Sequence, residues 1–317
     1  MAEPRGRARA KRRRRAAFLV VAFLALALAL RGERPPGPTG QWMAAAGLSP
    51  RFETVDGVRL RYLRAGTGPA VVLMHGFASS IVTWRDVMPD LARAHDVVAV
   101  DFPGFGGSEI REGLPLSAYP RLVVGLMDRL GVARASLVGN SMGGGAAIVI
   151  AALHPERVER LVLMDSVGYN LASGDRPWLL RAAGFKPVAR LIEALPIRRP
   201  MVTLALRQIF HDDRLVTPER IDEYVAPLLR PGAVAAAQAL LASGDDMGLP
   251  GLASRVRAPT LVVWGRQDTW VPVAQADRFL ADIPGSRKAV IQGCGHLPQE
   301  ERPAEVSALL DEFLAAR

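Results

Sequence analysis

The organisation of this chain depends on one stretch, Leu137-Val138-Gly139-Asn140-Ser141-Met142-Gly143-Gly144-Gly145. The apolar run 135–138 predicts a short buried strand that leads into it, and the apolar residues 146–153 predict a helix that follows. Gly-X-Ser-X-Gly between a strand and a helix places a serine on a tight, strained turn, which the flanking glycines make possible. The turn lifts the serine hydroxyl out of the sheet, beside a helix N-terminus. The motif alone also fits a glycine-rich turn in another α/β protein, so its meaning depends on partner residues.

The composition argues against nucleic acid as a partner. The chain has 317 residues, enough for one large domain or two modest ones, and half of them are apolar. Its net charge of +9 comes mainly from residues 1–15, which carry eight basic side chains and one acidic one, a net +7. The remaining 302 residues therefore carry only +2. We expect no basic nucleic-acid-binding face on the folded part.

The cysteine and histidine patterns exclude several kinds of site. Cys294 is the only cysteine, so neither an intrachain disulfide nor a cysteine metal cluster can form. The five histidines show no metal-ligand spacing such as H-E-x-x-H. We therefore expect no metal and no cofactor, and we interpret Cys294 as a small buried residue rather than a second nucleophile.

Residues 16–30 form an uncharged apolar run between a basic tail, 1–15, and a linker, 31–50. As a helix this run would span about 22 Å, short of the roughly 30 Å hydrocarbon core, although flanking arginines can snorkel. We predict a single-pass N-terminal membrane anchor that leaves the rest of the chain outside the cytoplasm. The alternative is a signal peptide, whose cleavage would give a secreted protein, because the length also suits its apolar region.

Strand and helix patterns alternate from residue 51 onward. Residues 52–55 and 58–63 predict an antiparallel hairpin. Mostly apolar runs predict further strands at 70–74, 97–101, 135–138, 160–165, 260–265 and 289–291. This alternation predicts a mostly parallel sheet flanked by helices, built from residues 51–168 and 255–317. Residues 169–254 show only helical periodicity and predict a helical cap over the site.

Asp268 and His296 follow two late strands and are the candidate partners of Ser141. A serine hydroxyl needs a base within hydrogen-bond reach, and that base needs a carboxylate to orient it. All three residues should share the carboxyl edge of the sheet, where ligands bind in open α/β sheets. Their chain order, Ser then Asp then His, is that of the nucleophile-elbow architecture. We predict Ser141 as nucleophile, His296 as general base and Asp268 as orienting acid, with Asp165 as the alternative acid.

Further short motifs accompany the serine motif. They are His75-Gly76-Phe77, Asp101-Phe102-Pro103-Gly104-Phe105-Gly106, His154-Pro155-Glu156-Arg157-Val158, Gly265-Arg266-Gln267-Asp268 and Gly295-His296. Over about residues 51–317 the chain resembles the α/β-hydrolase superfamily. The resemblance implies an eight-stranded, mostly parallel sheet with a helical cap inserted between strands 6 and 7. It also implies that the backbone N–H groups of Phe77 and Met142 form the oxyanion hole, with His75 supporting that loop by hydrogen bonding.

The serine at position 141 limits the chemistry that this resemblance implies. Related enzymes that remove halides or open epoxides use an aspartate there, so Ser141 leaves attack on a carbonyl group. We expect hydrolysis of a carboxylic ester through an acyl-enzyme, on a small apolar acyl or ester substrate. Carbon–carbon cleavage of a vinylogous diketone is the alternative, because residues 139–144 resemble the elbow of the meta-cleavage hydrolases, whereas residues 75–80 depart from their pattern. An alternative of another class is a ligand-binding protein with a silent triad.

Three residues are predicted to line the substrate pocket. Trp178 and Trp270 are large aromatic side chains near the predicted cap, and Leu297 follows His296. Each of them would equally suit core packing. The sequence does not indicate an oligomeric state.

Overall fold

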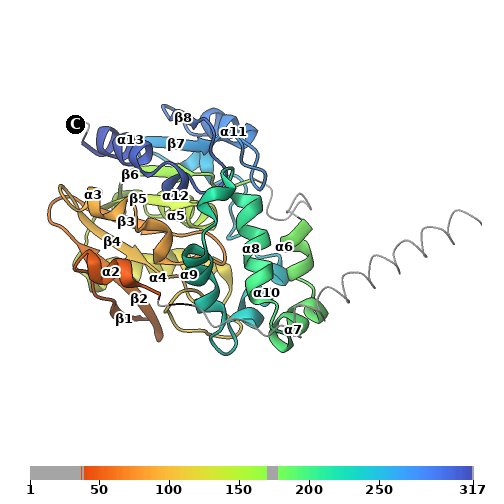
Figure 1. Cartoon of the computed structure of the whole chain (residues 1–317). Coiled ribbons are helices and arrows are strands. Elements are labelled where there is room, and N and C mark those ends of the chain that lie inside the picture. Colours follow the sequence, from red (N-terminus) through yellow and green to blue (C-terminus); the bar gives the residue numbers. More distant parts are fainter. Residues whose placement is uncertain (1–36, 38, 170–177, 316–317) are drawn as a thin grey trace, which may run out of the picture.

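The computed structural model describes residues 37, 39–169 and 178–315. They form one sheet with helices on both faces and a further group of helices beside it (Figure 1). The sheet has eight strands in the order β1-β2-β4-β3-β5-β6-β7-β8. β2 is antiparallel to β1 and to β4, and the remaining neighbours are parallel. The predicted fold class, a mostly parallel eight-stranded sheet flanked by helices, is confirmed.

The elements of the sheet and its flanking helices follow the predicted alternation closely. The strands are β1 (Arg51–Val55), β2 (Val58–Ala65), β3 (Ala70–Met74), β4 (Asp96–Val100), β5 (Ala135–Asn140), β6 (Val158–Met164), β7 (Thr260–Gly265) and β8 (Arg287–Ile291). The flanking helices are α3 (Met88–Leu91), α4 (Tyr119–Arg129), α5 (Met142–Leu153), α11 (Ala274–Asp282), α12 (Pro298–Glu301) and α13 (Pro303–Ala315).

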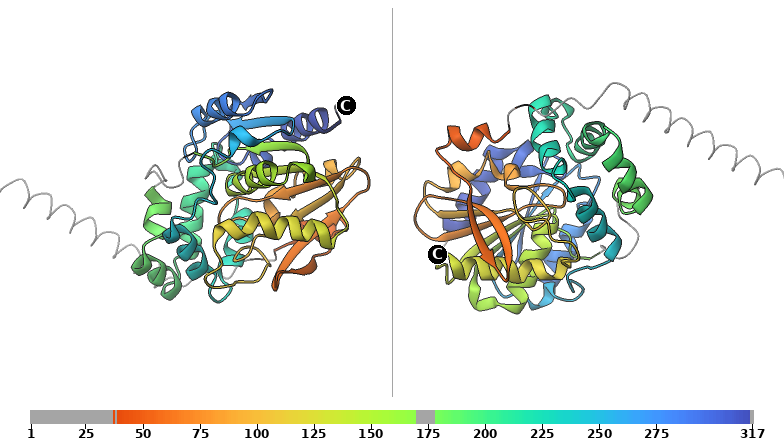
Figure 2. Two further views of the ribbon diagram at one scale, coloured as in Figure 1. Left: turned by 180° about the vertical axis from the view of Figure 1, so that it is seen from behind. Right: turned by 90° about the horizontal axis from the view of Figure 1, so that it is seen from below.

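The sheet separates two apolar cores, because successive side chains of a strand point to opposite faces. Val72 and Met74 of β3 pack on the face that α4, α5 and α11 cover. Val71 and Leu73 pack on the other face, beneath α3 and α13. Figure 2 shows α4 and α5 lying along one face of the sheet. Burial on both faces explains why these strands read as continuous apolar runs rather than as alternating patterns.

Parallel strands place their carboxyl ends at one edge of the sheet. Ser141 directly follows β5, and Asp165 directly follows β6. Asp268 and His296 lie in the loops after β7 and β8 at the same edge. The topology therefore brings together residues that are more than 100 positions apart in the sequence.

The structure describes five α-helices between β6 and β7, and we call them the inserted helices. They are α6 (Trp178–Ala183), α7 (Lys186–Ala194), α8 (Arg198–Ile209), α9 (Pro218–Leu228) and α10 (Ala233–Ser243). Figure 1 shows them side by side along one side of the sheet. The periodicity of 179–189 predicts a single helix, but the structure has two, because Pro187 lies in the first turn of α7, where its missing N–H is not needed.

The segment 31–50, predicted as a linker, contains a short helix, α2 (Gln41–Ala45). Trp42 and Met43 of this helix pack against a buried apolar cluster, which explains why the segment is ordered. The N–H of Gly40 donates a hydrogen bond of 2.7 Å to Glu223 of α9. The second half of this segment is therefore attached to the folded part through α2 and Gly40.

The helices that the structure describes lie between residues 41 and 315. Among them, no single helix is both long and apolar enough to cross a bilayer. The consecutive helices α9 and α10 reach the required length and composition together, but they meet at a bend of 82°. The predicted basic tail 1–15 and membrane segment 16–30 lie outside the described residues, so both stay predictions.

Candidate active site

Ser141 occupies the strained turn that the sequence predicts. It has φ 53° and ψ −115°, in a region that side-chain-bearing residues rarely adopt. A Cβ on Gly139 would lie 2.3 Å from the carbonyl oxygen of Gly143. A Cβ on Gly143 would lie 2.1 Å from the carbonyl oxygen of Met74 in the neighbouring strand. Both glycines are therefore required, because the turn packs backbone against backbone.

Backbone hydrogen bonds hold the strained turn in place. The N–H of Ser141 donates to the carbonyl of Met164 at the end of β6, at 2.9 Å. The carbonyl of Ser141 accepts from the N–H groups of Gly145, at 3.1 Å, and Val167, at 3.2 Å. The helix that follows, α5, is buried along almost its whole length. The position of the serine is thus fixed by the sheet and by a core helix.

His296 and Asp268 form a buried pair. Nδ1 of His296 lies 2.7 Å from Oδ2 of Asp268. The other carboxylate oxygen, Oδ1, accepts from the backbone N–H groups of Trp270, at 2.7 Å, and Val271, at 3.0 Å. Donors on both oxygens stabilise an ionised carboxylate. An ionised Asp268 accepting from Nδ1–H leaves Nε2 of His296 as the basic nitrogen.

The loop that carries His296 is attached on two sides. The side-chain amide of Asn140, next to the serine, donates to the carbonyl of His296 at 3.1 Å and to that of Met164 at 3.2 Å. The N–H of His296 donates to the carbonyl of Ile209, at the end of α8, at 2.7 Å. Glu301 accepts from the N–H groups of Gly295, at 2.6 Å, and His211, at 2.8 Å. The histidine loop therefore connects the serine turn to the inserted helices.

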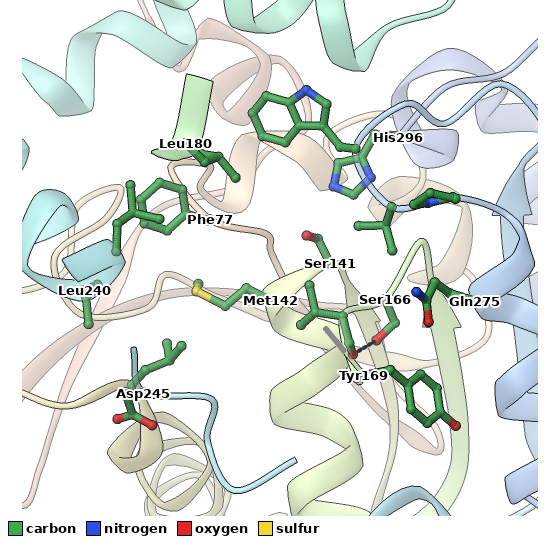
Figure 3. A pocket seen from close by; sticks show the side chains of 17 residues that line it. Phe77, Ser141, Met142, Ser166, Tyr169, Leu180, Leu240, Asp245, Gln275 and His296 are labelled. Carbon is green, nitrogen blue, oxygen red and sulfur yellow. Dashed lines mark hydrogen bonds between the residues drawn. The ribbon is translucent and has the colours of Figure 1, made fainter. Parts of the chain in front are cut away.

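Ser141 and His296 both line a cavity of about 130 Å³, and Figure 3 shows the imidazole ring of His296 above the Ser141 side chain. Apolar side chains form most of its wall, with contributions from the sheet edge and from α6 and α10. Asp245 is the only carboxylate that lines it among the described residues, and no described lysine or arginine does so. The cavity suits an uncharged, apolar group close to a nucleophilic hydroxyl.

The loop after β3 lies against the same cavity. His75 is buried, its Nδ1 lies 2.7 Å from the carbonyl oxygen of Gly76, and its Nε2 accepts from the N–H of Phe102 at 2.9 Å. These contacts fix a neutral imidazole with the proton on Nδ1, and burial lowers the pKa of His75. The supporting role expected for His75 agrees with these contacts. Phe77 and Met142 both line the cavity, where their predicted oxyanion-hole role requires them to be.

Asp165 lies beside the His296–Asp268 pair. Ligand atoms of the three side chains are all within 4.8 Å of one another, an arrangement that could also surround a metal ion. Two negative charges at that separation repel by about 3 kcal/mol at an effective dielectric constant of about 20. Burial raises the pKa of Asp165 well above its usual value, and the charge of Asp268 raises it further. Asp268 rather than Asp165 contacts His296 Nδ1, so the structure favours Asp268 as the orienting acid.

The other predicted positions have mixed outcomes. Trp270 lines the cavity, whereas Leu297 packs with Val82 and Leu206 in a separate buried cluster and not on the cavity wall. The side chain of Trp178 lies outside the described part of the chain. Burial raises the pKa of the Cys294 thiol far above its usual value, so this buried residue is a poor nucleophile.

Sequence reasoning missed most of the cavity wall. Ser166, Val167 and Tyr169 follow directly after β6, and their position at the carboxyl edge was the available signal. Leu180 and Leu240 come from the inserted helices. No sequence signal identifies them, because a helix among other helices has apolar residues on several faces.

Comparison with known proteins agrees with this geometry. A family model described as alpha/beta hydrolase fold matches residues 69–303. The chain therefore belongs to the α/β-hydrolase family, as its motifs predict. It is 36% identical over 279 residues to a 2-hydroxymuconate semialdehyde hydrolase of Pseudomonas sp. strain CF600, covering 82% of this chain and 91% of the relative.

Two solved structures illustrate the range of relatives. A 2-hydroxy-6-oxo-6-phenylhexa-2,4-dienoate hydrolase from Rhodococcus sp. strain RHA1 superposes with a TM-score of 0.74 at 27% identity, covering 85% of this chain and 99% of that one. A membrane phospholipase A superposes with a TM-score of 0.71 at 26% identity, covering 96% of this chain and 98% of that one. The chain is thus a hydrolase whose relatives act on different bonds.

Replacing Asp268 tests the choice of the orienting acid. We expect Asp268→Asn to slow acylation of Ser141 by about 10⁴-fold, because the amide stabilises the wrong tautomer of His296. The rate of covalent labelling by a fluorophosphonate probe measures this step directly. Asp165→Ala should slow labelling far less, and the reverse order of the two effects would move the acid to Asp165.

Proposed function

We propose that this hydrolase cleaves neutral carboxylic esters with an apolar acyl group, through an acyl-enzyme on Ser141. The observation that supports this most is the convergence of Ser141 and His296 on an apolar cavity, with Asp268 bonded to the far side of the imidazole. Ser141, Asp268 and His296 come from three different loops and lie together at the carboxyl edge of the sheet. That arrangement is what acyl transfer to a serine requires.

The cycle uses the same groups twice. His296 Nε2 takes the proton of the Ser141 hydroxyl as its oxygen attacks the ester carbonyl, and the imidazolium then protonates the leaving alcohol. Water attacks the acyl-enzyme with His296 again as base, which releases the acid and restores the hydroxyl. The backbone N–H groups of Phe77 and Met142 would stabilise the negative charge on the carbonyl oxygen. Asp268 keeps the imidazole oriented throughout.

The walls of the cavity favour a neutral acyl group. Among the described lining residues, Asp245 is the only one with a charge at neutral pH besides any charge on His296. Partial burial would raise the pKa of Asp245, but hydrogen bonds from Ser117 and Met247 outweigh it and lower that pKa. The group is therefore a carboxylate, and it would repel an anionic substrate.

A second cavity extends the space available to the acyl group. It has a volume of about 140 Å³ and is lined almost entirely by apolar side chains of α6, α8 and α10. Four side chains line both cavities: Phe77, Leu180, Leu241 and Trp270. An acyl tail that passes these residues would bury its methylenes among the inserted helices. We infer that longer acyl chains are preferred over acetyl.

Carbon–carbon hydrolysis of a vinylogous diketone is the second candidate. The relatives support it better than they support ester hydrolysis, since several are named as hydrolases of meta-cleavage products. Two of those names specify a dienoate, a substrate that carries a carboxylate. Arg198 on the wall of the second cavity is a cation toward which such a carboxylate could point. Ester hydrolysis is in turn supported by the membrane phospholipase A, whose match extends over 96% of this chain.

A side-by-side assay of short p-nitrophenyl esters and a ring-fission dienoate distinguishes the two reactions. We expect higher kcat/KM on the esters, because the cavity that Ser141 and His296 line has no lysine or arginine among its described lining residues and has the carboxylate of Asp245. Ser141→Ala should lower kcat by about 10⁶-fold, while Ser136→Ala on β5, the strand that precedes Ser141, serves as the matched control.

A higher kcat/KM on the dienoate would establish the second candidate instead. Undiminished ester hydrolysis by Ser141→Ala would overturn the nucleophile. Failure of the wild-type chain to react with a fluorophosphonate would indicate a silent triad and a binding role.

The second cavity is tested by a chain-length series. Ala237 of α10 lines this cavity, and Ala239 of the same helix is exposed. We expect Ala237→Trp to lower kcat/KM for an octanoyl ester by about tenfold, with little change for an acetyl ester, because the indole fills the space of the tail. Ala239→Trp should leave both values unchanged. An equal loss on both esters with Ala237→Trp would contradict the assignment.

We also propose that residues 16–30 hold the enzyme at a membrane, with the catalytic part outside the cytoplasm. The support comes from the sequence: an uncharged apolar run directly follows a tail with a net charge of +7. The full chain should sediment with membranes and resist a high-salt wash, whereas a chain that starts at residue 37 should not sediment. Recovery of the intact full chain in the soluble cytosolic fraction would refute the anchor.

A further inference from the structure

Asp165 is a buried acid that the catalytic cycle described above does not use. Its residue is 0% exposed, and it directly follows β6 with a positive φ of 43°. Oδ1 accepts the N–H of Gly265 at 3.0 Å. Oδ2 is buried and has no hydrogen-bond partner among the described residues. A buried polar oxygen left without a partner is costly, so the state of this oxygen requires an explanation.

Asp268 is the neighbouring carboxyl group. One of its carboxyl oxygens lies within 4.8 Å of a carboxyl oxygen of Asp165. Both groups are acceptors when ionised, and two acceptors cannot bond to each other without a proton between them. Buried carboxylates at this separation do not both ionise, so one of the two keeps its proton.

The donors around each carboxyl group decide which one keeps the proton. Asp268 receives two backbone N–H groups and the Nδ1–H of His296, all of which stabilise its charged form. Among the described residues, the N–H of Gly265 is the one donor that bonds to Asp165. The proton therefore belongs on Oδ2 of Asp165, the oxygen that otherwise has no partner.

We propose that Asp165 is a positioning residue that stays protonated at neutral pH and donates a hydrogen bond to the Asp268 carboxylate, which holds it in place for His296. This inference rests on the proposed acyl-transfer function. The proton stays on Asp165 throughout the cycle, so no additional proton transfer is required. The bond satisfies the buried oxygen and adds a fourth donor to Asp268.

The remaining charged and titratable groups near Asp165 fit this assignment. Glu301 is a buried carboxyl whose negative charge disfavours ionisation of Asp165. The Cys294 thiol is buried and stays neutral. The guanidinium of Arg302 donates to the carbonyls of Gly293 and Glu301. His296 is bonded to Asp268 rather than to Asp165. None of the other described groups named here places a positive charge against Asp165, where it would favour the ionised carboxylate.

Two substitutions of Asp165 distinguish a neutral donor from an ionised or purely structural carboxyl. Asp165→Ala should lower kcat by about tenfold at unchanged KM, the loss of one hydrogen bond to a charged group. Asp165→Asn keeps an oxygen for Gly265 and an N–H for Asp268, so it should restore kcat to within about threefold of the wild-type value. The acidic limb of the pH profile of kcat/KM should be unchanged in Asp165→Asn, because no charge is removed.

An ionised Asp165 predicts a different profile. Asp165→Asn would then remove a negative charge near His296, lower the pKa of its imidazolium and move the acidic limb to lower pH by about one unit. That shift would overturn the proposal. Equal activity of Asp165→Ala and the wild type would also overturn it, since no positioning role would remain. Asp96→Asn, at the opposite edge of the sheet, is the control for loss of a carboxyl elsewhere.

Infrared spectroscopy gives a readout that does not depend on turnover. The wild-type protein at neutral pH should show the carbonyl band of a protonated carboxyl group, and the difference spectrum against Asp165→Asn should contain this band. A difference spectrum with only carboxylate bands would refute the proposal. If the proposed function fails, the wild type hydrolyses no ester, yet this measurement still decides where the proton lies.

Discussion

The backbone of Ser141 is the constraint on which the rest of the structure depends. Its left-handed conformation exists only because Gly139 and Gly143 let three backbone segments meet at distances that any Cβ would block. That close approach requires β5 to be central, with β3 on one side and β6 on the other. It also requires α5 to be packed against the sheet without polar side chains. The sheet order and the apolar composition of α5 therefore both serve the position of one hydroxyl group.

The serine turn is coupled to the histidine loop through its neighbour. The side-chain amide of Asn140 donates to the carbonyl of His296, so the strand that leads to Ser141 also helps to place His296. On its other side the histidine loop bonds to Ile209 of the inserted helices. A movement of those helices would reach His296 through this single backbone hydrogen bond. The loop of His296 is thus bonded both to the inserted helices and to the strand that leads to Ser141.

The sheet and the three catalytic candidates could be predicted because each depends on local sequence and on the rule that parallel strands end at one edge. Ser141, Asp268 and His296 each follow an apolar run within a few residues. The cavity wall could not be predicted in the same way, because the face that Leu180 or Leu240 presents depends on how five helices pack together. Leu297 shows the limit directly: adjacent to His296 in the sequence, it points into a different apolar cluster.

The two candidate reactions differ less in their catalytic groups than in the charge of the substrate that the cavity must accommodate. A dienoate carries a carboxylate, and moving that charge into an apolar cavity costs several kcal/mol unless a cation or several donors meet it. The carboxylate of Asp245 adds repulsion there. An ester brings no charge of its own and develops one only on the carbonyl oxygen, where the N–H groups of Phe77 and Met142 would meet it. Selectivity between the reactions therefore resides in the walls, and the apolar, acidic wall described here suits the neutral substrate.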